Sequence, residues 1–374
     1  MLGQRLSHVL DAPECVGGGG QAPVGHRGIV LTAPYTRYVR AVEYRANDDV
    51  RIVERDRPTA GAGDIIVALR ACGVCGSDVL EWYMKPRAPL IPGHEVVGIV
   101  VETDNHASHL RPGTRVFVHH HVPCLVCAAC RRGATTSCLL FRSTRLDPGG
   151  LAELIRVPRE IVATDVLPLP DHLTDVDATL IEPLACCVRT FRRARFRPGD
   201  SVLIVGAGLT GQLHAQIARA WGAGDVVIID PIEERRGLAR GLAGARAFAL
   251  DSEDLANLRC DLVIVTPPRV DVLDRAIDYA APGGTVVLFG PTGPGETLAL
   301  EPHRVFFREI AITTTYSADP DDTRTALDLL SRGLVRVAPL VTRVVPFEQA
   351  AEAFRVTATH REALKVVVTA NGPS

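Results

Sequence analysis

Cysteine, histidine and glutamate residues fall into two sets of different character near the middle of the N-terminal half. One set follows a C-x2-C-x2-C-x7-C spacing and supplies thiolates for one tetrahedral zinc ion: Cys124, Cys127, Cys130 and Cys138. Buried cysteines that act only as small apolar residues have no reason to recur in this rhythm. An all-thiolate site leaves no position for a substrate, so we expect it to fix a loop.

The second set predicts an open metal site of mixed ligands. Cys75 follows a predicted strand, and His94 and Glu95 stand at the head of another. Catalytic zinc keeps one coordination position for water or substrate. Spacing alone does not choose between Cys72 and Cys75, and the remaining anionic ligand is either Glu95 or Glu182.

Other residues near these sets have less specific interpretations. Three successive histidines form a tract: His119, His120 and His121. Alternation along a strand would place neighbours on opposite faces, so all three cannot bind one ion. We expect surface or supporting roles for them. Cys186 and Cys187 lie on an apolar predicted helix, which favours core positions. The segment Glu81–Tyr83 follows Cys75 and is a candidate for the wall of a substrate pocket.

A glycine-rich turn predicts a dinucleotide site. Gly206, Gly208, Leu209, Thr210 and Gly211 belong to a G-x-G-x-x-G motif between an apolar strand and an amphipathic helix. The first glycine permits the tight turn, the second admits a pyrophosphate, and the third lets helix and strand pack closely. The phosphates are expected at the free N–H groups of the helix N-terminus.

The residue at the end of the next strand favours NAD. Asp230 stands where a ribose-binding carboxylate belongs, and its charge would repel a 2′-phosphate. Arg235 and Arg236 lie close enough to keep NADP as the alternative. Thr266, at the end of a later predicted strand, completes the expected cofactor site.

Bulk composition limits the classes of protein and of partner. A chain of 374 residues with 47% hydrophobic and 22% charged content predicts a soluble protein of two domains. A net charge of -2 gives no reason to expect nucleic acid or a membrane as partner. Thiolate-rich spacing without an apolar leader or a membrane-length run predicts a reducing, cytoplasmic location.

The order of predicted elements indicates one domain inserted in another. Residues 38–184 show short strands, among them Tyr38–Tyr44, Asp64–Ala71, Glu95–Val101 and Thr114–Val118, which suggest a barrel-like domain. Residues 185–334 alternate strands and helices, as in a doubly wound Rossmann domain. Residues 335–374 return to the first domain, and residues 1–37 form an N-terminal extension that we expect to be poorly ordered.

Together these motifs resemble the zinc-dependent medium-chain alcohol and polyol dehydrogenases. The resemblance rests on Cys75-Gly-Ser-Asp, Gly93-His94-Glu95, the four-cysteine set, Glu182-Pro-Leu and the glycine motif, in that order. It covers residue 38 to the C-terminus. It implies a GroES-like β-barrel catalytic domain with an inserted Rossmann domain, about two zinc ions per chain, and a homo-oligomer, either dimer or tetramer.

The resemblance also assigns roles to individual residues. It makes Cys75, rather than Cys72, and His94 ligands of the catalytic zinc, with Glu182 as the ligand typical of the polyol and sugar branch. Glu95 matches an acidic neighbour that ligates zinc or exchanges with its water. Ser77 matches the hydroxyl that begins the proton relay. Many relatives have a histidine at the position of Leu80, which cannot carry a proton.

The implied activity is the interconversion of an alcohol with its ketone or aldehyde. Zinc lowers the pKa of a bound alcohol, and the alkoxide passes its hydride to NAD or NADP. A zinc set with a carboxylate favours a polyol, sugar, cyclitol or amino alcohol as the small-molecule substrate. The alternatives are an NADPH-dependent aldehyde or alkene reductase and a non-catalytic zinc- and nucleotide-binding scaffold.

Overall fold

The computed structural model describes residues 37–103, 110–359 and 363–370. Residues 36–374 form one compact unit. The predicted N-terminal extension, residues 1–37, lies outside the described residues except for Arg37. In the described part of the chain, no helix has the length and apolar character needed to cross a bilayer.

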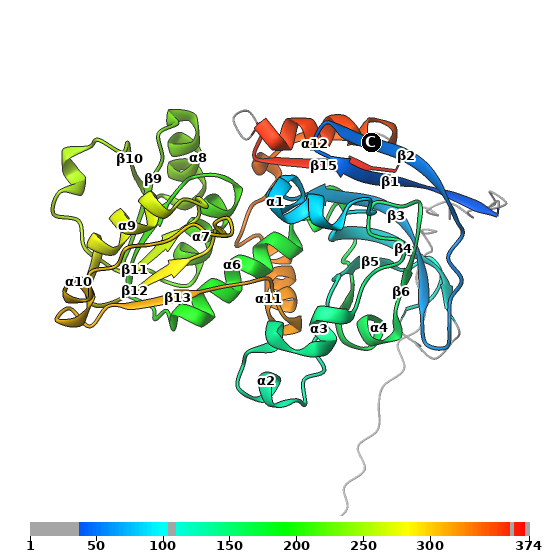
Figure 1. Ribbon diagram of the computed structural model, residues 1–374, viewed down its shortest axis with the longest axis horizontal. Coiled ribbons are helices and arrows are strands. Elements are labelled where there is room, and N and C mark those ends of the chain that lie inside the picture. Colours follow the sequence, from blue (N-terminus) through cyan, green and yellow to red (C-terminus); the bar gives the residue numbers. More distant parts are fainter. Residues whose placement is uncertain (1–36, 104–109, 360–362, 371–374) are drawn as a thin grey trace, which may run out of the picture. The chain divides into compact units, whose positions relative to one another are not determined.

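The first sheet joins strands from both ends of the described chain (Figure 1). Its seven strands follow the order β14-β15-β3-β4-β5-β7, and β6 pairs with β3 beside this path. The bounds are β3 Ile65–Val74, β4 Glu95–Thr103, β5 Arg115–Val118, β6 Leu154–Val157, β7 Val166–Pro168, β14 Val341–Pro346 and β15 Lys365–Thr369. Since β15 lies antiparallel to β3, the last strand packs against the strand that leads to Cys75.

A separate two-stranded ribbon precedes this sheet. Strands β1 (Tyr38–Ala46) and β2 (Asp49–Asp56) pair in antiparallel fashion. The side chains of Val42 and Tyr44 on β1 are buried in the core of the first sheet, whereas much of β2 is exposed. The ribbon therefore covers one part of the core with β1 and turns β2 toward solvent.

The second sheet is entirely parallel. Its strand order is β10-β9-β8-β11-β12-β13, in which the chain starts in the middle and extends first to one edge and then to the other. The bounds are β8 Ser201–Val205, β9 Asp225–Ile229, β10 Arg246–Phe248, β11 Cys260–Val265, β12 Ala280–Leu288 and β13 Ala311–Thr314. In such a sheet ligands bind at the carboxyl ends of the strands where the order reverses, which here is next to β8.

The longer helices connect and cover these sheets. They are α6 Ile181–Ala194, α7 Leu209–Ala220, α8 Glu233–Ala243, α9 Val270–Asp278, α11 Pro320–Ser331 and α12 Ala350–Thr359. Shorter α-helices are α1 Glu81–Met84, α2 Ala128–Arg131, α3 Leu139–Ser143, α4 Arg159–Asp165, α5 Asp175–Ala178 and α10 Pro302–Phe306. The 3-10 turns are η1 Gly76–Val79, η2 Lys85–Arg87, η3 Thr135–Ser137, η4 Glu253–Leu255, η5 Ala338–Leu340 and η6 Phe347–Gln349.

Helix α6 is fixed by apolar burial along one face. Leu184, Val188 and Phe191 are at most 1% exposed and share a core with Ile204 of β8 and Leu213 of α7. Each such side chain contributes roughly 1.5–3 kcal/mol when it leaves water. This packing sets the position of the N-terminal turn of α6, which carries Glu182.

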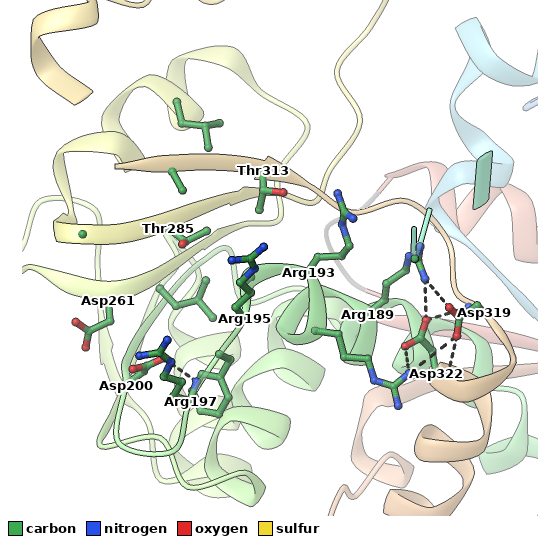
Figure 2. Close-up of a pocket in the computed structure, with 18 of the residues that line it drawn as sticks. Arg189, Arg193, Arg195, Arg197, Asp200, Asp261, Thr285, Thr313, Asp319 and Asp322 are labelled. Atoms are coloured by element: carbon green, nitrogen blue, oxygen red, sulfur yellow. Dashed lines mark hydrogen bonds and ion pairs between the residues drawn. The ribbon is translucent and has the colours of Figure 1, made fainter. Parts of the chain in front are cut away.

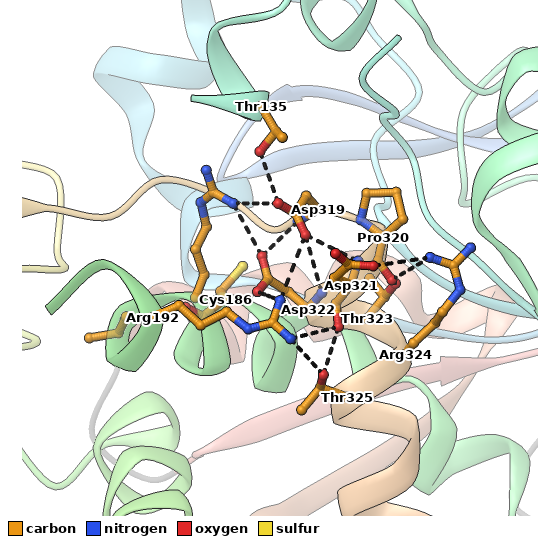
Figure 3. Close-up of polar contacts among 12 residues, drawn as sticks. Thr135, Cys186, Arg192, Asp319, Pro320, Asp321, Asp322, Thr323, Arg324 and Thr325 are labelled. Carbon is orange, nitrogen blue, oxygen red and sulfur yellow. Dashed lines mark hydrogen bonds and ion pairs between the residues drawn. The ribbon is translucent and has the colours of Figure 1, made fainter. Parts of the chain in front are cut away.

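Buried ion pairs join α6 to α11, which runs beside it (Figures 1 and 3). The Arg189 guanidinium lies 2.9 Å from a carboxylate oxygen of Asp319 and 3.2 Å from one of Asp322. Arg192 pairs with the other oxygen of Asp322 at 2.7 Å. The Thr135 hydroxyl donates to Asp319 at 3.0 Å, so the cysteine-rich segment is tied to the same cluster.

Candidate functional site

One cavity of about 1460 Å³ connects the ligand-bearing loops of the first sheet with the glycine turn of the second. Most residues predicted for the open metal site and the cofactor site line it: Cys75, Ser77, His94, Glu95, Glu182, Gly206, Gly208, Leu209, Thr210, Asp230, Arg235 and Thr266. Gly211 does not line this cavity. Instead it lies against the preceding turn, where an added Cβ would be 1.9 Å from the Gly206 carbonyl oxygen. Gly211 therefore serves the close packing of helix and strand.

Asp78 positions Cys75 and His94 of the open metal group. One oxygen of Asp78 accepts the backbone N–H of Cys75 at 3.0 Å, which closes a capping box at the start of η1. The other oxygen lies 3.3 Å from Nδ1 of His94. Burial lowers the pKa of His94, but the charge and hydrogen bond of Asp78, together with Cys75, outweigh it and the net shift is upward. This contact leaves Nε2 of His94 as the ring nitrogen for a metal.

Glu95 is held by a lysine from the last strand. Both of its carboxylate oxygens accept from Nζ of Lys365, at 2.6 and 2.7 Å, and neither side chain is more than 1% exposed. Burial lowers the pKa of Lys365, but the charge and hydrogen bond of Glu95, with the charges of Cys75 and Glu182, together hold it above its ordinary value. Gly73 of β3, directly opposite Glu95, makes room, because a Cβ there would lie 1.7 Å from Oε2 of Glu95.

The predicted ligands of the open site divide into two groups. Ligand atoms of Cys75, His94 and Glu95 lie within 4.8 Å of one another, and those of His119, His120 and Glu182 form another such group. The ring centroids of His94 and His120 are 5.0 Å apart, so the groups adjoin. Sulfur, nitrogen and oxygen donors of this kind fit zinc.

The histidine tract does not follow the predicted alternation. Strand β5 ends at Val118, so His119 and His120 lie beyond the strand and both approach Glu182. Nδ1 of His119 contacts Asp165 at 2.8 Å, and within the described part of the chain Nε2 of His119 and Nδ1 of His120 are buried without a hydrogen-bond partner. Of the two expected roles, surface or supporting, burial leaves the supporting role for His119. His121 instead contacts the Thr144 carbonyl at 2.8 Å.

The four predicted cysteines come together in a separate lobe. Their sulfur atoms all lie within 4.8 Å of one another. The Cys127 and Cys130 sulfurs are 3.5 Å apart, and those of Cys124 and Cys130 are 4.0 Å apart. Burial raises the pKa of Cys138, but backbone N–H groups, first that of Cys124, lower it to about 6. A tetrahedral thiolate set with a readily formed anion fits structural zinc.

The glycine turn leaves space for phosphate at the start of α7. Gly206 has φ +96°, and a Cβ there would lie 2.4 Å from the Thr266 hydroxyl. An added Cβ at Gly208, the N-cap of α7, would meet no atom within 4 Å. The N–H groups of Leu209 and Thr210 face this opening, because the first turn of a helix lacks internal acceptors.

Asp230 closes the side of the turn next to β9. Its oxygens accept backbone N–H groups of Ala207 at 2.7 Å and Ile232 at 2.8 Å. Arg236 donates to the Asp230 carbonyl and pairs with Glu233, whereas Arg235 lines the cavity. The Thr266 hydroxyl donates to the Val205 carbonyl at 2.9 Å, so it braces the turn.

Two further expectations concern the wall of the cavity. Trp82 and Tyr83 line it, as predicted for a substrate pocket, but Glu81 does not. Leu80 also lines it, so the position that bears a histidine in many relatives is apolar here. Among the described carboxylates near Ser77, Asp78 is already occupied by Cys75 and His94.

A second hollow of about 920 Å³ lies at the end of α6 (Figure 2). Arg193, Arg195 and Arg197 border it and are exposed, whereas Arg192 is paired with Asp322. Asp261 on the same hollow accepts from Ser201 at 2.6 Å. The arginine run thus forms a solvated helix end with one member in the α6–α11 cluster.

Three residues that shape the site were not among those predicted from the sequence. Asp78 is signalled by its position three residues after Cys75, which permits a capping box. Lys365 is one of only two lysines in the chain and stands at the start of an apolar strand. Asp165, which orients His119, gives no signal of its own in the sequence.

Comparison with known proteins identifies the family. Residues 61–171 match the alcohol dehydrogenase GroES-like domain, and residues 210–332 match the zinc-binding dehydrogenase domain. D-arabinitol dehydrogenase 1 of Uromyces fabae is 31% identical over 345 residues, covering 88% of this chain and 97% of that protein. D-xylulose reductase A of Aspergillus oryzae is 29% identical over 322 residues, covering 80% and 88%.

A solved structure shows the same fold. A zinc-binding dehydrogenase of Sinorhizobium meliloti bound to NADP is 27% identical, with a TM-score of 0.78 over 89% of this chain and all of that one. The chain therefore belongs to the zinc-dependent medium-chain alcohol and polyol dehydrogenases. The predicted fold class, a GroES-like domain with a Rossmann domain, and the predicted enzyme class, an NAD(P)-dependent oxidoreductase, are confirmed.

We predict that Gly73→Ala destabilises the protein by about 3 kcal/mol or more, because the new Cβ displaces Glu95 from Lys365 and separates a buried ion pair. Chemical denaturation measures the loss. Gly241→Ala is the control, since a Cβ there meets no atom within 4 Å and α8 should gain about 0.5–1 kcal/mol. Equal stability of the Gly73→Ala variant and the parent would contradict the account of this pair.

Proposed function

We propose that the protein is a zinc-dependent dehydrogenase that interconverts an alcohol of the polyol, sugar, cyclitol or amino alcohol class with its ketone or aldehyde. One observation carries the proposal. The Cys75–His94 group and the glycine turn at Gly206 line a single cavity, so a substrate at the first lies beside a nucleotide at the second.

Cys75 and His94, with Glu182 or Glu95, would hold the catalytic zinc, and the four-cysteine lobe would hold a structural zinc. With its cofactors bound, the cavity would supply a Lewis acid for the alcohol oxygen and a nicotinamide as hydride acceptor. Asp78 fixes the backbone of Cys75 and the ring of His94. Glu95 lies with Cys75 and His94, but Lys365 binds both of its oxygens, so Glu182 in the adjoining group is the less occupied of the two carboxylates.

Ser77 is the group that takes the proton of the substrate hydroxyl, at its Oγ. It lines the cavity on η1, two residues from Cys75. Leu80 cannot pass this proton on, and the carboxylates of Asp78 and Glu95 are held by other residues. Water in the cavity is therefore the route by which the proton leaves Ser77.

The nucleotide is proposed to be NAD. The start of α7 would hold the pyrophosphate, and Asp230 would bind the adenosine ribose. The names of two relatives, an arabinitol dehydrogenase and a xylulose reductase, favour a polyol among the candidate substrates. The family resemblance supports a homo-oligomer.

We expect about two zinc ions per purified chain by elemental analysis, and about one in a Cys75→Ala variant without alcohol-dependent NADH formation. Removal of one thiolate ligand should release the open-site metal and leave the lobe intact. Cys260→Ala is the matched control, because Cys260 is buried in the core of the second sheet away from both groups. A Cys75→Ala variant with full activity would contradict the proposal.

Asp230 provides a test of nucleotide choice. We expect kcat/KM to favour NAD over NADP, and Asp230→Asn to reduce this preference about tenfold or more by removing the charge that repels a 2′-phosphate. Asp225→Asn, at the other end of β9, is the control and should leave the preference unchanged. A wild-type preference for NADP would refute the assignment.

A further inference from the structure

The wall of the cavity carries two arginines beyond the metal group. Arg87 and Arg145 line it together with Tyr83 and Tyr316, and we name these four residues the cationic rim. They come from separate segments: Tyr83 from α1, Arg87 from η2, Arg145 from the loop after α3, and Tyr316 from the loop after β13. The rim therefore joins the loops of the first sheet to those of the second.

Arg87 is held over an aromatic ring. Its guanidinium carbon lies 3.7 Å from the centroid of the Tyr83 ring. A cation stacked on a ring keeps its N–H donors at the edges, free for a ligand in the plane. Arg87 is exposed and makes no ion pair with a carboxylate in the described part of the chain.

Arg145 is anchored by one nitrogen only. Its Nη1 donates to the Thr144 carbonyl at 2.6 Å and lies 3.2 Å from Nδ1 of His121. Burial, with the charge of Arg145 next, lowers the pKa of His121 to about 3, so the imidazole beside it is neutral. Among the described residues no carboxylate pairs with Arg145, and its other nitrogens remain available.

Tyr316 lines the same cavity as both arginines. Burial and Tyr83 raise the pKa of the Tyr316 hydroxyl, while the charges of Arg87 and Arg145 oppose this rise.

Three carboxylates of the cavity, Asp78, Glu95 and Asp147, have partners other than the rim. Asp78 holds Cys75 and His94, Glu95 holds Lys365, and Asp147 pairs with Arg156 at 3.1 Å. Arg55, another cation on this wall, is paired with Glu43. The positive charge of the rim is therefore not neutralised by these groups.

We propose that the substrate carries an anionic group, a phosphate or a carboxylate, at the end away from the reacting carbinol, and that Arg87 and Arg145 bind it. This rests on the proposed dehydrogenase function and narrows its substrate class. The planar fork of arginine matches the oxygens of either anion, and the hydroxyls of Tyr83 and Tyr316 add donors. Arg87 and Arg145 are specificity-determining residues of the same reaction.

The test compares neutral and anionic alcohols of matched skeleton. D-arabinitol, xylitol and D-glucitol are assayed with their terminal phosphates and their aldonates, with NAD and with NADP. In the wild type we expect kcat/KM to favour one anionic series by about tenfold or more. Arg87→Met and Arg145→Met should each lower the ratio of anionic to neutral kcat/KM about tenfold, and rising ionic strength should lower it too.

Arg142→Met is the control, because Arg142 is exposed on α3 and does not line the cavity. It should leave the ratio unchanged. Preference for the phosphates or for the aldonates identifies the anion. If a neutral polyol is oxidised as well as both anionic forms, and neither variant changes the ratio of anionic to neutral kcat/KM, this proposal is overturned. The proposed dehydrogenase function would then still stand. Failure of every alcohol with both nucleotides refutes the dehydrogenase function and this proposal with it.

Discussion

The buried ion pair between Glu95 and Lys365 is the constraint on which the metal site depends. It joins β4 to β15 across β3. The pair therefore fixes the position of β15 along the sheet relative to β4, the strand that begins with Glu95. A buried carboxylate costs several kcal/mol unless a partner meets it, which leaves little freedom in where these strands end. His94 immediately precedes Glu95, and the position of its ring follows from this lock. Gly73 is the third part of the arrangement, because only a residue without a side chain leaves space for the pair.

The other residues of the site are positioned relative to this ion pair. Asp78 ties the Cys75 backbone to the His94 ring, and the apolar face of α6 brings Glu182 to the adjoining histidines. The α6–α11 cluster around Arg189 fixes the far end of the same helix and, through Thr135, the cysteine-rich segment. The parallel sheet then places its glycine turn at the opposite wall of the cavity. Metal donors, nucleotide turn and cationic rim are therefore polar groups in the wall of one mostly apolar cavity.

Much of this was predictable, because metal ligands and phosphate turns need particular residues at fixed short spacings. The four cysteines and the glycine turn show this most clearly. Partners far apart in the sequence could not be predicted. Lys365 lies 270 residues after Glu95, and no local pattern connects the two residues. Strand β2 could not be predicted because half of its side chains are exposed and most of these are charged, so its apolar alternation is weak. Strand alternation was expected through the histidine tract, but β5 ends at Val118, a point set by the sheet and not by the histidines themselves.

A double-mutant cycle on Glu95 and Lys365, followed by chemical denaturation of the zinc-loaded protein, tests the central constraint most directly. Lys365→Met alone should cost about 3–5 kcal/mol, since it leaves a buried carboxylate unpaired. Adding Glu95→Gln should recover part of this loss, with an interaction energy of about 1 kcal/mol or more between the two sites. Losses that simply add, or a Lys365→Met variant as stable as the parent, would contradict the view that this pair holds the site together.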